Sequence, residues 1–319
     1  MRKVIVLYNP LSGRRRQRRT ADVEAVLAVL RAAAIEANAS PTEADGEAGR
    51  QAQEAIASGC DAVFVCGGDG TIHDVLQGMI GTAASLAIIP LGTANTLAHD
   101  LRIPWNPAAA ARVALAARPR RVTVGRVQYL DFKGGEASRY FIVAVGVGVD
   151  AHLFYKLNIG LKRQLGMLAY YFKATQLWLT HGMERFVAEY LETGASETKQ
   201  AVVSELLAVR IRNFGGILQV LAPGASLGRD DLRVVLFRTS NRVLYLAYVL
   251  RGLLRKRWSV AGIELLNCEK VSCRGLPASA AGDEKRLNPR VYVEADGELV
   301  GTIPAEITVV PGGVNLLAP

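Results

Sequence analysis

The sequence predicts two domains, an α/β domain followed by a β-rich one. The chain has 319 residues, beyond the size at which a single hydrophobic core usually stops growing. In its first part, short apolar runs alternate with stretches of helical spacing, the pattern of an open, mostly parallel sheet with flanking helices. Further on, runs rich in β-branched residues are separated by turn residues, the pattern of an antiparallel, sandwich-like domain with helical insertions. We therefore expect an α/β domain over 1–120, to which about 303–319 returns, and a β-rich domain over 121–302.

The first domain is predicted from three strands and the helices between them. Parallel strands covered on both faces are apolar throughout, and the runs at 3–8, 61–66 and 86–91 fit this pattern. Helical spacing follows at 22–37, 47–59, 71–80 and 93–101, and a polar turn is expected around Ser40 to Thr42.

The second domain is predicted from its β-branched runs. Strands are expected at 120–130, 138–150, 185–191, 204–214, 216–223, 232–239, 263–274 and 290–299. Helical insertions are expected at 152–180 and 241–257, and the segment 305–313 is a candidate strand of the first domain.

The charge of the chain favours an anionic partner. There are 38 Lys and Arg against 29 Asp and Glu, a net charge of +9. Nucleotide phosphates, anionic lipid and nucleic acid all fit this excess. Nucleic acid is disfavoured because no aromatic residues alternate with the basic ones on a plausible platform. The four cysteines are scattered, which indicates reduced thiols in a cytoplasmic protein.

Gly67-Gly68-Asp69-Gly70-Thr71 directly follows the strand at 61–66 and precedes a helix. Bare backbone amides and a helix N-terminus favour phosphate. Asp69 would repel phosphate unless a magnesium ion lies between them. A tight turn with Asp69 as a helix cap is the alternative.

Two more polar loops follow strand ends, NPLSG at 9–13 and PLGTANTLA at 90–98. The second offers Gly92, Thr93 and Asn95. Ligands of open α/β sheets bind beyond the carboxyl ends of the strands, so we expect the three loops to meet there. The chain has no Gly-Lys-Ser/Thr, which excludes a Walker-type loop.

In this order and spacing, the three motifs resemble the catalytic domain of the diacylglycerol kinase and sphingosine kinase superfamily, most closely its soluble bacterial lipid kinases. The segments at 145–153, 161–174, 214–227 and 294–319 resemble later parts of the same family. The resemblance implies ATP-dependent phosphorylation of a lipid hydroxyl, with the active site in the cleft between the domains.

The resemblance also implies roles for single residues. Asp69 would act through ATP-associated magnesium, and Glu298 would be the base for the acceptor hydroxyl, supported by Asp296. An ordinary Asp-Gly hairpin turn is the alternative for the last two residues. The nucleotide would be held by Asn9, Pro10, Ser12, Gly13, Thr42, Gly67, Gly68, Asp69, Gly70, Thr71 and Thr93, and the loop argument adds Gly92 and Asn95.

The sequence departs from the family at three places. His73-Asp74 stand where many bacterial members have Asn-Glu, and Thr96 replaces an acid. Arg229-Asp230 replace an Asp-Gly pair of a structural metal site, so a metal at Asp230 requires Asp230 or Asp231 to shift into position.

We therefore expect an ATP- and Mg²⁺-dependent kinase of diacylglycerol or a related lipid alcohol, cytoplasmic and peripherally bound to the inner face of the membrane, with homodimerisation left open. The basic run 14–19 could contact nucleotide, lipid headgroups or solvent. The segment 253–258 fits a membrane surface or a packed helix with a solvated end. Two alternatives stay open: another GGDG kinase, such as an NAD kinase-like enzyme, and a non-catalytic nucleotide- and lipid-binding membrane-surface protein.

Overall fold

The chain forms two compact units. The computed structural model describes residues 1–13, 18–43, 46–149, 183–214, 222–254, 256, 258–277 and 290–319. The α/β unit comprises Met1–Val124, Ile211–Ile217 and Val310–Pro319, and the β-rich unit comprises Gly125–Arg210 and Leu218–Val309. The helical insertion predicted at 152–180 and the motif at 161–174 lie outside the described residues, as do parts of the segments at 138–150, 145–153, 214–227 and 216–223.

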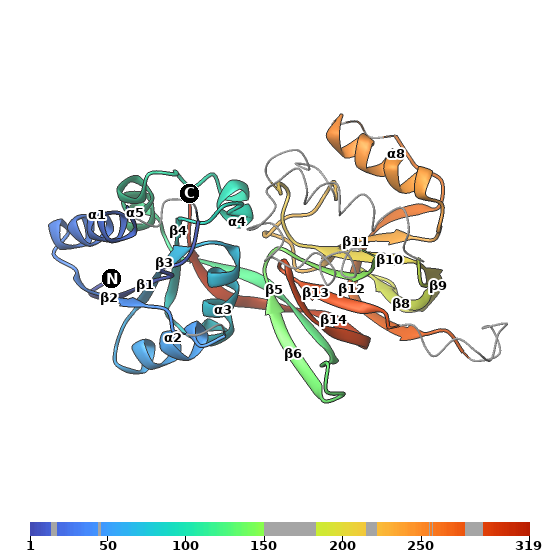
Figure 1. Ribbon diagram of the computed structural model, residues 1–319, viewed down its shortest axis with the longest axis horizontal. Coiled ribbons are helices and arrows are strands. Elements are labelled where there is room, and N and C mark those ends of the chain that lie inside the picture. Colours follow the sequence, from blue (N-terminus) through green and yellow to red (C-terminus); the bar gives the residue numbers. More distant parts are fainter. Residues whose placement is uncertain are drawn as a thin grey trace. The chain divides into compact units, whose positions relative to one another are not determined.

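The α/β unit is built on a parallel sheet (Figure 1). Its order is β2 (Glu36–Pro41), β1 (Lys3–Tyr8), β3 (Ala62–Gly67), β4 (Ser85–Pro90) and the end of β14 (Glu298–Leu317). Every residue of β3 and β4 is buried, because both faces of these central strands are covered. The predicted parallel sheet is confirmed.

Helices cover both faces of this sheet. In Figure 1, α1 (Arg19–Ala32) and α5 (Pro107–Ala116) lie on one face, and α2 (Ala48–Ala57) and α3 (Asp69–Met79) on the other. A short helix, α4 (Thr96–Asp100), follows the loop after β4. The pair α2 and α3 crosses closely at two glycines, since a Cβ on Gly78 would lie 1.9 Å from the carbonyl oxygen of Gly49.

The bounds predicted for the helix at 22–37 were wrong at both ends. The helix begins at Arg19 and ends at Ala32, and the residues that follow form β2, where only a polar turn was expected. This edge strand pairs with β1 through its main chain and leaves most of its side chains exposed, so its sequence carries no apolar pattern.

The β-rich unit is antiparallel, as predicted. Its strands pair in the order β14, β13 (Tyr292–Ala295), β7 (Ala144–Gly148), β10 (Glu205–Val209), β11 (Leu232–Phe237), β12 (Ile263–Gly275), β8 (Phe186–Glu192) and β9 (Thr198–Val203). A further pairing of β12 with β14 folds the sheet back on itself around a buried apolar cluster that includes Phe141 and Phe186. The hairpin of β5 (Arg120–Leu130) and β6 (Glu136–Phe141) belongs to the same unit from Gly125 onward.

Three details of this unit differ from the expectation. The strand predicted at 138–150 is divided into β6 and β7, and the one predicted at 290–299 is divided by a turn into β13 and the start of β14. The third is β9, which was not predicted. The helix predicted at 241–257 is present as α8 (Arg242–Leu253). No helix in the described part of the chain is long and apolar enough to cross a membrane.

We predict that Gly78→Ala destabilises the α/β unit by about 1–3 kcal/mol, because the new methyl group would overlap the backbone of Gly49. Urea unfolding followed by the helical circular dichroism signal measures this change. Gly275→Ala is the matched control, since a Cβ there would meet nothing within 4 Å, and it should stay within about 0.5 kcal/mol of the wild type. Equal stability of the two variants would contradict the helix contact.

Candidate functional site

The loops after β1, β3 and β4 touch one another. A Cβ on Gly92 would lie 2.4 Å from the Cα of Gly68, and a Cβ on Gly13 would lie 2.2 Å from the carbonyl oxygen of Leu91. The side-chain amide of Asn9 donates to the hydroxyl of Thr71 at 3.4 Å. The three predicted loops are thus packed into one surface, and glycines are needed where their backbones meet.

Helix α3 begins inside this surface. Its N-cap residue is Gly68, which has no side chain to cap the first turn. The first amides of a helix have no intrahelical partner, and they lie at the positive end of the helix dipole. The start of α3 therefore suits an anion. Gly70 and Thr71 belong to this first turn, and Gly67 accepts a hydrogen bond from the amide of Leu91 at 2.9 Å.

Asp69 is oriented by the start of α4. Its carboxylate accepts long hydrogen bonds from the amide of Leu97 at 3.4 Å and from the hydroxyl of Thr96 at 3.5 Å. Thr96, the residue that replaces an expected acid, thus contacts Asp69, the carboxylate of the Gly-Gly-Asp-Gly motif.

Asp69 fits the ligand set of a magnesium ion shared with a nucleotide. In the described residues, no three His, Cys, Asp or Glu side chains gather into a metal cluster. Magnesium in phosphate-transfer sites is held by one or two carboxylates together with substrate phosphates and water. A single carboxylate beside an uncapped helix start matches this pattern.

Asn95 stabilises its own loop through hydrogen bonds to Gly92. It is buried and has a left-handed backbone with φ of 50°. Its side-chain oxygen accepts from the amide of Gly92 at 2.8 Å, and its nitrogen donates to the carbonyl of Gly92 at 3.0 Å. Both ends of the side chain are used, so Asn95 fixes the shape of the loop and leaves Thr93 exposed beside it.

The remaining predicted nucleotide residues occupy the neighbouring strand ends. Pro10 is exposed, and the amide of Ser12 donates to the carbonyl of Asn9 at 3.3 Å. The amide of Thr42, just past β2, donates to the carbonyl of Tyr8 at 2.8 Å. These residues follow the same edge of the sheet as the glycine loop.

Arg19 links two of the loops, a role that the sequence did not predict. Its guanidinium is buried and donates to the carbonyl oxygens of Ser12 and Leu91. Burial lowers the pKa of this arginine. A cation in the first turn of a helix opposes the helix dipole, and this was the only local signal of a special role. Residues 14–17 of the predicted basic run lie outside the described residues.

A cavity of about 500 Å³ opens beside the loop after β4. Its volume falls within the usual range for small-molecule sites. Trp105 lies at this cavity with its ring edge-on to His99 at 4.7 Å. The cavity is lined by Arg19, Asp22, Pro90, Leu91, Gly92, Thr93, Trp105 and Pro107.

In the β-rich unit, Asp296 and Gly297 form a two-residue hairpin turn between β13 and β14. Their φ angles of 49° and 88° are those of a type I′ turn. The buried carboxylate of Asp296 accepts hydrogen bonds from the amides of Ile142, Val143 and Ala144 at 2.9 to 3.0 Å. Asp296 therefore anchors the chain between β6 and β7.

Glu298 has a different environment two residues later. Its side chain is 39% exposed, and its Oε2 accepts from Nη1 of Arg139 at 2.8 Å. This carboxylate is positioned by an arginine and remains open to solvent. Arg139 was not predicted, because it is 159 residues away in the sequence and no local motif marks it.

The predicted metal position in the β-rich unit contains an arginine ion pair. Asp231 is buried, and Arg229 binds both of its carboxylate oxygens while Thr193 donates to Oδ2 at 2.9 Å. Arg210 donates to the carbonyls of Arg229 and Asp231. Burial alone would raise the pKa of Asp231, but the hydrogen bonds from Arg229 and Thr193 outweigh it and keep this pKa below its ordinary value. The guanidinium of Arg229 thus supplies positive charge at Asp231. The carboxylate at the centre of this hydrogen-bond network is therefore that of Asp231 and not that of Asp230, the residue named from the sequence.

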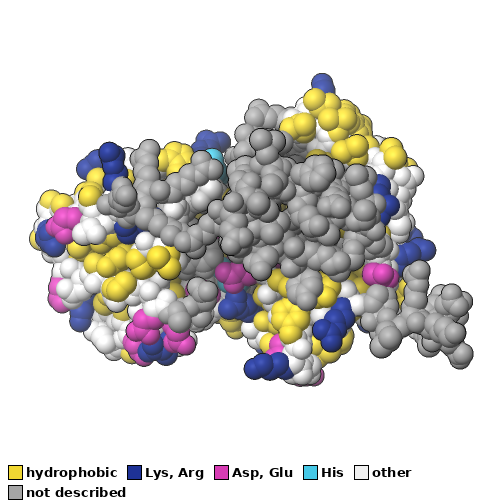
Figure 2. Space-filling view, viewed as in Figure 1, with side chains coloured by type: hydrophobic (Ala, Val, Ile, Leu, Met, Phe, Trp, Pro, Cys, Tyr) yellow, Lys and Arg dark blue, Asp and Glu magenta, His cyan; other side chains and the backbone are white. Residues whose placement is uncertain are grey.

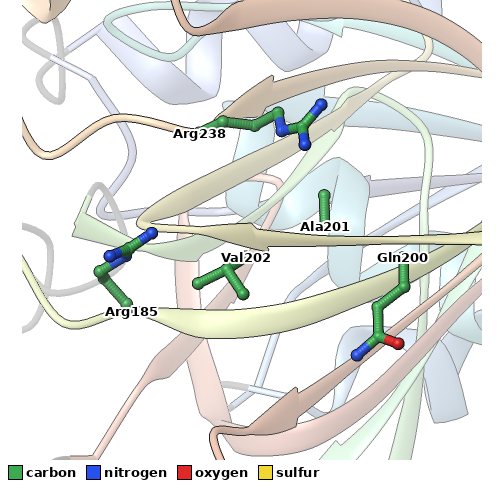
Figure 3. Close-up of a pocket in the computed structure, with 5 residues that line it drawn as sticks. All are labelled: Arg185, Gln200, Ala201, Val202 and Arg238. Carbon is green, nitrogen blue, oxygen red and sulfur yellow. The ribbon is translucent and has the colours of Figure 1, made fainter. Parts of the chain in front are cut away.

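A second cavity, of about 430 Å³, lies in the β-rich unit and contains none of the predicted site residues (Figure 3). It is lined by Arg185, Gln200, Ala201, Val202 and Arg238. The guanidinium of Arg238 pairs with Glu264 at 2.8 Å. The two arginines flank the strand that carries Ala201 and Val202.

We predict that Arg229→Ala lowers the free energy of unfolding by about 1–3 kcal/mol at neutral pH, because it removes the guanidinium that donates to both oxygens of the buried Asp231 carboxylate. The folded-state pKa of Asp231 is depressed, so this stability is present above the unfolded pKa and lost as the pH falls through the folded value. The difference between variant and wild type should therefore shrink below the ordinary pKa of 3.8.

Urea unfolding at several pH values tests this prediction. Arg274→Ala is the control, because its pair with Glu189 is exposed and should contribute less than about 1 kcal/mol. A difference for Arg229→Ala that does not depend on pH would argue against the ion pair.

Comparison with known proteins agrees with the motifs. Residues 3–127 match the family model of the diacylglycerol kinase catalytic domain. A diacylglycerol kinase of Bacillus subtilis (strain 168) is 25% identical over 325 residues, which cover 100% of this chain and 97% of the relative. A diacylglycerol kinase of Staphylococcus saprophyticus is 32% identical over 174 residues, covering 54% of this chain and 53% of that protein.

The fold is also shared with a solved structure. The crystal structure of a Bacillus anthracis str. Sterne protein assigned to the diacylglycerol kinases superposes with a TM-score of 0.75. The match covers 99% of this chain and 95% of that one at 21% identity, and so shows the common fold. The chain is thus similar to diacylglycerol kinases over its whole length, and residues 3–127 match their catalytic domain, which together with the three motifs supports a lipid kinase of the diacylglycerol kinase and sphingosine kinase superfamily.

Proposed function

We propose that the chain is an ATP- and Mg²⁺-dependent kinase that transfers the γ-phosphoryl group of ATP to the hydroxyl of diacylglycerol or a related lipid alcohol. It works in the cytoplasm, on substrate held in the inner face of the membrane. The α/β unit binds the nucleotide, and the β-rich unit contributes the acceptor side. The observation that carries the proposal is the packing of three strand-end loops around the uncapped start of α3, with Asp69 in its first turn.

The loops supply what a triphosphate requires. Backbone amides at Gly68 and Gly70 and the hydroxyls of Ser12, Thr71 and Thr93 are donors for phosphate oxygens. Buried Arg19 adds a positive charge behind the loops without itself being free to move. Asp69 would hold magnesium, which when bound neutralises charge on the phosphates.

Glu298 is the residue that we assign as base. The acceptor oxygen attacks the γ-phosphorus, its proton passes to the Glu298 carboxylate, and ADP leaves. Glu298 suits this task because its carboxylate is partly exposed and is steered by Arg139. Asp296 supports the base indirectly, since it fixes the turn from which β14 starts.

The proposal is tested with labelled ATP, magnesium and a panel of lipid alcohols in mixed vesicles. We expect a labelled lipid from the wild-type protein. Label on soluble acceptors only would instead indicate another GGDG kinase. Binding of ATP and vesicles without any labelled product would indicate a non-catalytic protein.

We predict that substitution of Glu298 affects catalysis, whereas substitution of Asp296 affects stability. Glu298→Gln should lower kcat by about 10²–10⁴-fold, the usual contribution of a general base, and leave the urea midpoint unchanged. Asp296→Asn should destabilise the β-rich unit by about 1–3 kcal/mol, because an amide cannot accept all three backbone hydrogen bonds. Full activity of Glu298→Gln would remove it as the base.

We also predict that Asp69→Asn weakens ATP binding only when magnesium is present. The amide keeps the size of the side chain but lacks the charge that attracts the metal. Calorimetric titration of ATP with and without Mg²⁺ separates the two contributions. A variant whose ATP affinity responds to Mg²⁺ as the wild type does would show that Asp69 does not engage the metal.

A further inference from the structure

Helix α8 exposes an apolar face that none of the described residues of its unit covers. Every exposed position from Val243 to Leu254 carries an aliphatic side chain, with exposed fractions from 41% to 70%. These residues are Val243, Leu246, Val249, Leu250, Leu253 and Leu254. Figure 2 shows the hydrophobic side chains gathered where Figure 1 places α8, with a basic side chain at their edge. We call this face the α8 patch.

The helix cannot turn this patch inward, because its other face is already fixed. Tyr245 stacks on Phe237 at 4.5 Å, and its hydroxyl lies 2.6 Å from the hydroxyl of Ser204. Tyr248 packs edge-on against Phe237 at 5.2 Å, and the guanidinium of Arg251 lies 4.1 Å above the Tyr248 ring. Polar and aromatic groups thus face the unit while aliphatic groups face outward, the reverse of an ordinary surface helix.

The charged residues that neighbour the patch in the sequence are all basic. From Leu232 to Ile263 the sequence contains no Asp or Glu, and Arg242 begins the helix. In the sequence, a basic run of three residues around Lys256 comes directly after the helix, followed by Trp258, which is exposed. Aliphatic anchors with flanking basic residues and a tryptophan are the composition of helices that lie in the interface of an anionic bilayer.

We propose that the α8 patch docks the protein on an anionic lipid bilayer, with the helix lying along the surface and its leucines in the acyl boundary. The 12-residue helix is too short to span a bilayer, and it does not need to. A second copy of the chain would bring the same positive charges against these, which disfavours self-association through this face. The inference deepens the proposed function, since it names the surface that brings the enzyme to its substrate.

The test is co-sedimentation of the full chain with vesicles, without ATP. One set is pure phosphatidylcholine and the other contains phosphatidylserine. We expect binding to the phosphatidylserine vesicles that weakens at high salt. The double variant Leu246→Glu/Leu250→Glu should lower the partition coefficient at least about tenfold, because it places charges in the acyl boundary. Lys256→Glu should weaken binding to the anionic vesicles only.

Phe132→Glu is the matched control, as Phe132 is 46% exposed on the same unit but distant in sequence from α8, and it should bind as the wild type does. Thermal unfolding checks that every variant is folded. Wild-type protein that stays in solution, or a double variant that still binds fully, would overturn the proposal. A dimer in vesicle-free solution that the double variant dissociates would also overturn it, and would assign the face to a second copy.

Different experimental outcomes would refute the docking proposal and the catalytic proposal. Turnover of a short-chain, water-soluble diacylglycerol needs no bilayer, so we expect the double variant to retain it while losing turnover in vesicles. Vesicle binding without any lipid product would refute the kinase assignment alone, and lipid product with unchanged binding of the double variant would refute the docking surface alone.

Discussion

The contact between two glycine backbones, after β3 and after β4, is the constraint on which the proposed nucleotide site depends. The two strands are neighbours in a parallel sheet and are buried along their whole length, so their carboxyl ends are fixed side by side. The loops that leave them can touch only if no side chain stands between Gly68 and Gly92. This places the start of α3, with Asp69, against the start of α4. Arg19 then ties the loop after β1 to the same surface through two carbonyl oxygens.

Carboxylates in this chain take their roles from their surroundings. Asp296 and Glu298 are two residues apart, yet one accepts three backbone hydrogen bonds and the other meets solvent beside an arginine. A buried carboxylate whose oxygens are filled by amides suits anchoring, whereas a partly exposed one can exchange protons with a substrate. Asp231 shows a third case, in which an arginine two residues earlier satisfies a buried acid.

The sequence predicts those elements whose pattern of apolar and polar side chains follows directly from burial. The strands β1, β3 and β4 are central and apolar, so pattern alone identified them, and the three glycine-bearing loops followed from their ends. The two missed strands, β2 and β9, lie at the ends of the sheet path, where exposed side chains leave a polar sequence and only main-chain pairing marks the strand. Arg19 and Arg139 were missed because their partners are distant in the sequence and a guanidinium can reach many positions.

The most direct test of the account is the affinity of Gly92→Ala for ATP. The added Cβ would lie 2.4 Å from the Cα of Gly68 and 2.6 Å from the side-chain oxygen of Asn95, so the loops must separate. The account predicts that ATP affinity falls by about tenfold or more, equivalent to about 1.4 kcal/mol, while circular dichroism still shows a folded chain. An affinity equal to that of the wild type in a folded Gly92→Ala protein would contradict it, because the site would then not depend on the contact between the loops.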